Sequence, residues 1–210
     1  MKKWLTMLMA MLMMLTVVSA YAAVPSKTTA DMTQTQDVMS ASGAELPDTM
    51  VVEVVKNDEK VEAEIAKLYT FVNNPAASKA PIEYFPVDVQ TNVQEHLTAM
   101  GVPEDYDIKQ MEINEFVAID EFGYEEQYGD IVARFSFATK YVKGTKLVGL
   151  LGIYGNEMDA NGNYLVEWVL VEAEALEDGS VALVLPQELM LRIQAASSTA
   201  LAVLNEPMKQ

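Results

Sequence analysis

The sequence predicts an α+β fold in which an N-terminal helical pair packs on an antiparallel β-sandwich, with a short helix inserted before the last strand. Three observations lead to this prediction. Residues 49–103 contain two stretches with the apolar period of amphipathic helices. Residues 104–206 form short runs rich in Val, Ile, Leu and aromatic residues, separated by turn residues. Pro186, followed by apolar residues four apart, indicates a helix among these runs.

Residues 1–23 have the three parts of an export signal. Lys2 and Lys3 give a basic start, an apolar run follows to about Val18, and the Ala-Tyr-Ala of residues 20–22 offers the small residues that a signal peptidase reads. An uncleaved membrane anchor is the alternative, because the apolar stretch is nearly long enough to span a bilayer. The pattern predicts cleavage near residue 23 and a secreted or envelope-associated protein without a further membrane span.

Residues 24–48 are rich in Ser, Thr, Ala, Gln and Asp and have no apolar period. Such a segment cannot bury enough apolar surface to offset the entropy that is lost when a chain is ordered. The sequence therefore predicts a flexible polar spacer between the signal and the folded part.

Two amphipathic helices are expected in the helical segment 49–103. The first runs from about Asp58 to Val72, with apolar residues at positions 61, 65, 68 and 72 on one face. The second presents apolar residues at 89, 93, 97 and 100 and ends at Gly101. The apolar run 51–55 fits either a short strand or the first turns of the first helix.

The strands of the sandwich are expected in residues 104–206. In 131–137, apolar residues at odd positions alternate with Val, Arg and Ser, which indicates a half-buried strand. Asp178-Gly179 lies between two apolar runs and predicts a tight hairpin. Within 186–196, Leu189 and Ile193 lie four residues apart and predict the inserted helix.

The order of these runs resembles the immunoglobulin-like and fibronectin-like β-sandwich modules of bacterial surface proteins. An apolar strand over TKLVGLLGIYG is followed by a polar hairpin, a strand that contains Trp168, the short strand SVALVL and a closing strand TALAVL. The resemblance covers about residues 106–206 and implies a sandwich module at the cell surface. The helix at 186–196 and the helical segment 49–103 depart from the pattern of these modules.

Composition excludes several chemistries. The chain has no cysteine, which excludes disulfides, thiolate nucleophiles and zinc–thiolate sites. Its formal net charge is −17, and removal of a signal that holds Lys2, Lys3 and no acidic residue would make the charge more negative. Nucleic acids and anionic lipids are disfavoured partners, because both bind cationic surfaces.

The loop NEMDANGNY, residues 156–164, carries oxygen ligands around a glycine. If Gly162 takes the glycine position of a helix–loop–helix calcium loop, the three preceding ligand positions are filled by Glu157, Asp159 and Asn161. The glutamate that such a loop needs at its end is replaced by Trp168, and both flanks read as strands. Since Asn-Gly is a typical turn dipeptide, a plain hairpin turn is the favoured alternative to a weak divalent-cation site.

A second candidate cation site lies in the acidic stretch 104–130, where Lys109 is the only basic residue. The candidate ligands in and beside its loop are Asp120, Glu121, Glu125, Glu126 and Asp130. Clustered carboxylates attract hard cations, calcium above all. Two of them could instead act as the acid and base of a glycoside hydrolase. The simplest interpretation is a solvated strand edge whose charges oppose aggregation.

Six aromatic side chains lie in or beside the predicted turns: Tyr124, Tyr128, Tyr141, Tyr154, Tyr164 and Trp168. Rings at loop ends can form a platform for sugars or peptides, or they can be the edges of the core. For a ligand platform, the candidates are Tyr124, Tyr128, Tyr154 and Trp168. The single histidine, His96, borders the apolar face of the second helix, so a structural role is expected.

These observations predict an exported, non-catalytic binding module of the cell envelope or the medium, monomeric, with a protein or carbohydrate ligand. No cofactor is expected beyond the calcium considered above. No serine lies in a G-x-S-x-G setting, and no glycine-rich phosphate loop is present. The alternatives are a small hydrolase that works through carboxylates and a secreted acidic inhibitor of a basic enzyme, which would bind through complementary charge.

Overall fold

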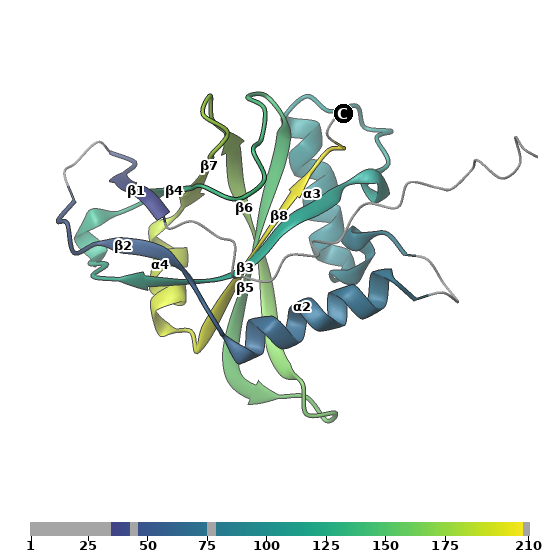
Figure 1. Cartoon of the computed structure of the whole chain (residues 1–210), viewed down its shortest axis with the longest axis horizontal. Helices are drawn as coiled ribbons and strands as arrows, with labels where there is room; N and C mark the ends of the chain where they lie inside the picture. The colour runs from purple at the N-terminus through teal and green to yellow at the C-terminus, as the bar shows by residue number, and fades with distance from the viewer. Residues whose placement is uncertain (1–34, 43–45, 75–78, 208–210) are drawn as a thin grey trace, which may run out of the picture.

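The computed structural model describes residues 35–42, 46–74 and 79–207. The predicted signal therefore lies outside the described residues, as do residues 24–34 and 43–45 of the predicted spacer. Figure 1 shows a strongly curved sheet with two helices on its outer side and a third helix at one end.

The chain forms three α-helices, three short 3₁₀ helices and eight strands within the described residues. The helices are α2 (Glu59–Val72), η2 (Pro81–Tyr84), α3 (Val87–Ala99), η3 (Ile108–Gln110), η4 (Glu126–Tyr128) and α4 (Gln187–Ala195). The strands are β1 (Thr35–Ser40), β2 (Val51–Val55), β3 (Glu112–Phe122), β4 (Ile131–Phe135), β5 (Lys146–Met158), β6 (Tyr164–Ala175), β7 (Val181–Leu185) and β8 (Ser198–Asn205). The α+β class, the helical pair and the inserted helix are confirmed.

All eight strands belong to one antiparallel sheet in the order β1-β4-β7-β6-β5-β8-β3-β2. The two end strands, β1 and β2, contact one another, so the sheet is nearly closed into a barrel. Two separate sheets were expected, and one continuous sheet is found. A right-handed twist that accumulates over eight strands lets one sheet curl around its own core. Opposite parts of the same sheet then cover the core from both sides, so a second sheet is not needed.

Two strands lie outside the region 104–206, where the strands were predicted. Residues 35–40 of the expected spacer pair with β4, so this part is ordered as β1. Residues 51–55 of the expected helical segment form β2 and pair with β3, which resolves the ambiguity of that run. Both are short strands at the ends of the sheet, where pairing with one neighbour compensates for a weak sequence signal.

One hydrophobic core fills the inside of the curved sheet. Every strand contributes apolar side chains to it, for example Val52 of β2, Phe135 of β4 and Leu151 of β5. The third helix, α4, closes one end of this interior with the side chains Leu189, Met190 and Ile193. Asp130 positions this helix, because its carboxylate accepts a hydrogen bond from Gln187 N–H at 2.9 Å.

A second core lies on the outer face of the sheet, under α2 and α3 (Figure 1). The first helix buries Val61, Leu68 and Val72, as its period predicts, and Asp58 caps it by accepting from the N–H groups of Lys60 and Val61. The second helix buries Val89, Val93 and Leu97. These side chains pack on residues of β3, β5 and β8, so the central strands are covered on both faces.

Candidate binding site

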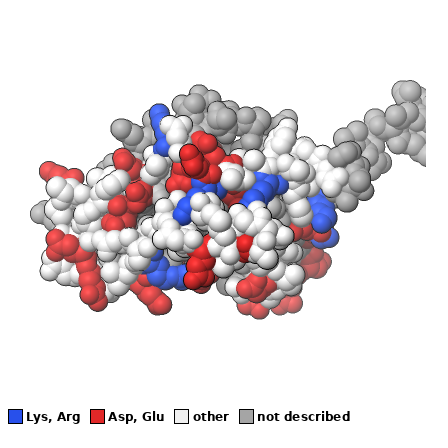
Figure 2. All heavy atoms as spheres, turned by 90° about the horizontal axis from the view of Figure 1, so that it is seen from below, with Lys and Arg blue, Asp and Glu red and all other residues white. Residues whose placement is uncertain are grey.

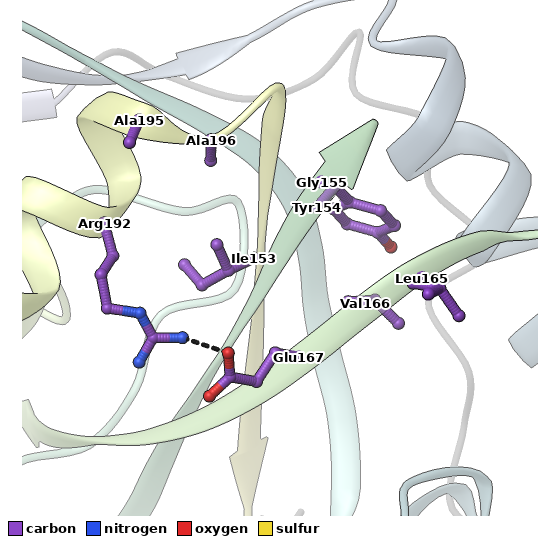
Figure 3. A pocket seen from close by; sticks show the side chains of 9 residues that line it. All are labelled: Ile153, Tyr154, Gly155, Leu165, Val166, Glu167, Arg192, Ala195 and Ala196. Atoms are coloured by element: carbon purple, nitrogen blue, oxygen red, sulfur yellow. Dashed lines mark ion pairs between the residues drawn. The ribbon is translucent and has the colours of Figure 1, made fainter. Parts of the chain in front are cut away.

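An open pocket of about 420 Å³ lies between α4 and the β5–β6 hairpin. Figure 3 shows its lining residues: Ile153, Tyr154, Gly155, Leu165, Val166, Glu167, Arg192, Ala195 and Ala196. The hairpin projects past the neighbouring strands in Figure 1, so the pocket lies where the closed part of the sheet ends. It is formed by two strands and the last turn of one helix.

The pocket forms because one side of α4 packs on the inner core and another side is directed toward the β5–β6 hairpin (Figure 3). Leu189 and Ile193 enter the inner core, whereas Arg192 points from the helix toward the hairpin (Figure 3). On the hairpin, Glu167 lies directly opposite Ile153 in the register of β5 and β6. Paired residues of neighbouring strands project on the same side of a sheet, so both side chains face α4.

An ion pair spans the mouth of this pocket. Arg192 Nη2 lies 2.6 Å from Glu167 Oε2, and the two side chains are 33% and 68% exposed. Ile153 and Leu165 line the same pocket as this pair, and Leu165 is 48% exposed. The arrangement offers an apolar surface together with one cation and one anion, which suits a ligand with both apolar and charged groups.

The base of the hairpin is fixed by Lys60 of α2. Its ammonium donates to Gly155 C=O at 3.3 Å and to Ser197 Oγ at 2.5 Å, and it lies 4.3 Å from the centre of the Tyr164 ring. A cation over an aromatic face is attracted by the ring quadrupole. These contacts tie the projecting strands to the body of the protein.

Tyr154 borders the pocket with its backbone, and its ring points to the other side of the sheet (Figure 3). The hydroxyl is buried and has no hydrogen-bond partner among the described residues. Burial, with the nearby Glu64 carboxylate, raises the pKa of this phenol above its ordinary value. Glu64 itself accepts from Tyr84 Oη and, at 3.2 Å, from Lys67 Nζ, which satisfies a buried carboxylate.

The carboxylates of the acidic stretch take part in local hydrogen bonds. Glu121 is buried and accepts from Tyr124 N–H at 3.1 Å, and burial raises the pKa of its carboxyl group. Glu125 accepts from Gln127 at 2.8 Å, and Glu126 accepts from Gln187 at 3.3 Å. Asp130 caps α4, and Asp120 accepts from the N–H of Glu121 at 2.9 Å. Across the described ranges, no group of three or more His, Asp or Glu side chains is arranged to hold a metal ion.

The loop 156–164 joins β5 to β6 as a hairpin, which agrees with the turn interpretation. Asp159 Oδ1 accepts from the N–H groups of Asn161 and Asn163, both at 2.8 Å, and Gly162 has a φ of 81°. These hydrogen bonds lower the pKa of Asp159. Since the Asp159 carboxylate binds the loop's own backbone, it stabilises the turn directly.

The predicted aromatic platform is not assembled at one place. Tyr124 is 4% exposed, donates to Gly129 C=O at 3.0 Å and packs edge-on against Tyr128. Tyr154 is 1% exposed, and Trp168 packs edge-on against Phe85 under the helices, with ring centres 4.8 Å apart. Tyr124 belongs to the inner core and Tyr154 to the outer core. His96 is half-buried in the last turn of α3.

The sequence did not reveal the pocket or its ion pair. In the sequence, Arg192 looks like an ordinary polar residue of an amphipathic helix, and Glu167 looks like an ordinary polar residue of a mainly apolar strand. They meet only because α4 crosses the end of the curved sheet. No protein-family model, curated protein or solved structure matches the chain. Within the described part, no helix has both the length and the apolar character needed to cross a membrane.

Proposed function

We propose that this protein is an exported, non-catalytic interaction module of the cell envelope or the medium, and that it binds a protein ligand at the pocket between α4 and the β5–β6 hairpin. The observation that carries the proposal is the exposed pair of Arg192 and Glu167 beside the apolar side chain of Leu165. Apolar contact with a few placed charges is the usual composition of a protein-recognition site.

A protein ligand is favoured over a carbohydrate because the pocket presents no aromatic face. Tyr154 is the only aromatic residue in its lining, and its ring points away from the pocket (Figure 3). Sugars are commonly held by stacking on exposed rings, so the missing ring counts against a glycan. Aliphatic side chains with a cation and an anion fit a peptide better.

A binding role is favoured over hydrolysis because the pocket has one carboxylate in its lining. A glycosidase needs two carboxyl groups about 5–9.5 Å apart in one cleft. Glu167 is the one acidic residue that lines the pocket, and it forms an ion pair with Arg192. The acidic side chains elsewhere are spread over the face seen in Figure 2, with Lys and Arg between them, rather than gathered in one patch.

Export is proposed from the sequence pattern of residues 1–23. The order of apolar runs in the sequence of residues 106–206, which resembles that of modules of bacterial surface proteins, is consistent with the same location. N-terminal sequencing of protein recovered from the medium tests this part. Recovery of a chain that begins near residue 24 supports it, and recovery of the intact chain only from the cytoplasm contradicts it.

Binding is tested by presenting the purified protein to a peptide-display library and to a glycan array. We expect enrichment of peptides, and we expect Leu165→Ser to weaken binding of the enriched peptides about tenfold. Leu191→Ser is the matched control, because Leu191 of α4 is exposed like Leu165 of β6 but does not line the pocket. Enrichment of glycans alone, no ligand in either screen, or equal loss in both variants would contradict the proposal.

A further inference from the structure

Strand β6 has a neighbour on both sides over only part of its length. Residues 172–175 pair with both β5 and β7. Tyr164 and residues 166–171 pair with β5 alone, because β7 ends at Leu185 and the chain turns into α4. The outer part of β6 is therefore a free sheet edge of eight residues, 164 to 171, beside the pocket.

The backbone groups that face this edge can be identified. Leu176 N–H donates to Ser180 C=O at 2.9 Å, across the turn that joins β6 to β7. Along an antiparallel strand, alternate residues direct both their N–H and C=O to the same neighbour. The backbone N–H and C=O groups of even-numbered residues of β6 therefore point toward β7, and those of odd-numbered residues point toward β5. The odd-numbered Asn163 agrees with this pattern, because its C=O accepts from Asp159 N–H at 2.7 Å.

Four residues thus direct their backbone groups outward where β7 is missing: Tyr164, Val166, Trp168 and Leu170. No hydrogen bond from another described residue reaches their outward N–H or C=O groups. Free edges in soluble proteins are usually blocked by charged side chains, lysine above all, by proline or by a covering segment. The stretch 164–171 contains neither lysine nor proline, and Glu167 is its one charged residue. These groups are available to pair with another extended chain.

The side chains along the edge define what such a chain would need. On the side of α4, Leu165 is half-exposed and Glu167 is 68% exposed. On the other side, Val166 and Trp168 are partly buried against the outer core. A strand laid along the edge would meet apolar neighbours on both faces and one carboxylate at the centre of the pocket side.

The geometry points to an extended segment of another protein, apolar with a central lysine or arginine, that adds to β6 as a further strand of the sheet. This inference rests on the proposed function and specifies how the ligand binds. Charge complementarity selects the occupant: the chain has a net charge of −17, and Glu167 stands at the middle of the edge. A second copy would bring the same net charge and a second Glu167 to this edge, so it is disfavoured.

The test uses amide chemical shifts of the isotope-labelled protein titrated with synthetic peptides of alternating valine and threonine around a central lysine. We expect shifts at the amides of Val166, Trp168 and Leu170 and slowed hydrogen exchange there, since these N–H groups become hydrogen-bonded. Two further peptides are methylated on alternate amides. In one peptide the methylated amides are those that would face β6, so the hydrogen bonds to the edge are lost and binding should be abolished. In the other peptide the methylated amides point away from β6, so the hydrogen bonds remain and binding should be retained.

Charge is tested with a matched pair of variants. Glu167→Lys should weaken binding of the lysine peptide about tenfold, and a peptide with central glutamate should regain that loss. Glu174→Lys makes the same charge change on the same strand, but where β7 already covers the edge, so it should leave binding unchanged. Equal effects of the two variants would overturn the inference.

The outcomes separate this inference from the proposed function. No shifts along 164–171 with any of the peptides, or equal binding of both methylated peptides, would overturn strand addition. A dimer seen by analytical ultracentrifugation and abolished by Glu167→Lys would overturn it as well, because the occupant would be a second copy. If library peptides still bind in a manner that depends on Leu165, the interaction module stands and only the binding mode is wrong.

Discussion

The two parts of β6 differ in their neighbours more than in their conformation. Residues 172–175 lie between β5 and β7, whereas residues 164–171 have β5 on one side and no strand on the other. The exposed charges Glu172 and Glu174 occur in the doubly paired part, and most of the apolar side chains occur in the singly paired part. Side-chain polarity along this strand therefore follows the coverage of its faces by helices, and it does not report whether the edge is paired.

The largest expected effect comes from the outer face of the singly paired part. Trp168→Ala removes a ring that packs edge-on against Phe85 and Phe116. We expect a loss of about 3 kcal/mol in the free energy of unfolding, measured by urea denaturation. Leu165→Ala, on the opposite face of the same part, should cost less than about 0.5 kcal/mol because Leu165 is half-exposed. Similar losses in both variants would show that the helices do not anchor the hairpin.

A smaller effect is expected from the glycines of β5, which run beside both parts of β6. A Cβ at Gly149 would lie 2.5 Å from Val171 Cγ2 and 3.3 Å from Leu183 Cδ2, inside the closed part of the sheet. Gly149→Ala should therefore cost about 2 kcal/mol in thermal or urea unfolding. Gly155→Ala is the matched control on the projecting part, where the nearest atom lies 3.8 Å away, and a comparable loss there would contradict the contrast.

The third prediction concerns the turn that brings β7 onto β6. Hydrogen bonds from Ser180, with the guanidinium of Arg134, lower the pKa of Asp178 to about 2, from an ordinary value of 3.8. Because the folded-state pKa is depressed, this carboxylate stabilises the fold above pH 3.8 and the contribution is lost as pH falls toward 2. Asp178→Asn should lower the melting temperature at pH 7 by less than the preceding variants do. The difference from the wild type should vanish near pH 2, and a constant difference across pH would argue against the titration.

The smallest effect on stability is expected at the ion pair of the pocket. Arg192 and Glu167 are partly exposed, so solvent screens their attraction. Double-mutant cycles with Arg192→Met and Glu167→Gln should give a coupling energy of about 0.5 kcal/mol, reduced by salt. A coupling of several kcal/mol would mean that the pair holds the hairpin in place, and then the pocket would be a structural joint rather than a site open to a ligand.

The helices were predictable because their signals are local. The apolar period of α2, its cap at Asp58, and Pro186 before α4 can all be read within a few residues. The long strands were predictable for the same reason, from alternation and from Asp178-Gly179. The short strand β1 was not predicted, and for β2 the sequence left a strand and a helical turn open, since the pairing of these strands with β4 and β3 depends on residues far away in the chain.

The sheet order and the site depend on non-local pairing, which one sequence does not encode in a readable pattern. The curved single sheet replaces the predicted sandwich because the end strands meet, and alternation looks the same in both architectures. The pocket follows from the place where β7 stops and α4 crosses the barrel end. The candidate residues in acidic loops and turns were chosen for their chemistry, and in the structure the carboxylates of Asp130 and Asp159 accept hydrogen bonds from backbone N–H groups.

The position of β8 has a consequence for how the molecule comes into being. This strand, Ser198–Asn205, lies between β5 and β3 and joins halves of the sheet that are far apart in the chain. A polypeptide that is synthesised from its amino end cannot complete this sheet until residues 198–205 have been made. Until then β3 and β5 lack the strand that pairs with both of them, so their apolar edges stay without a partner during synthesis.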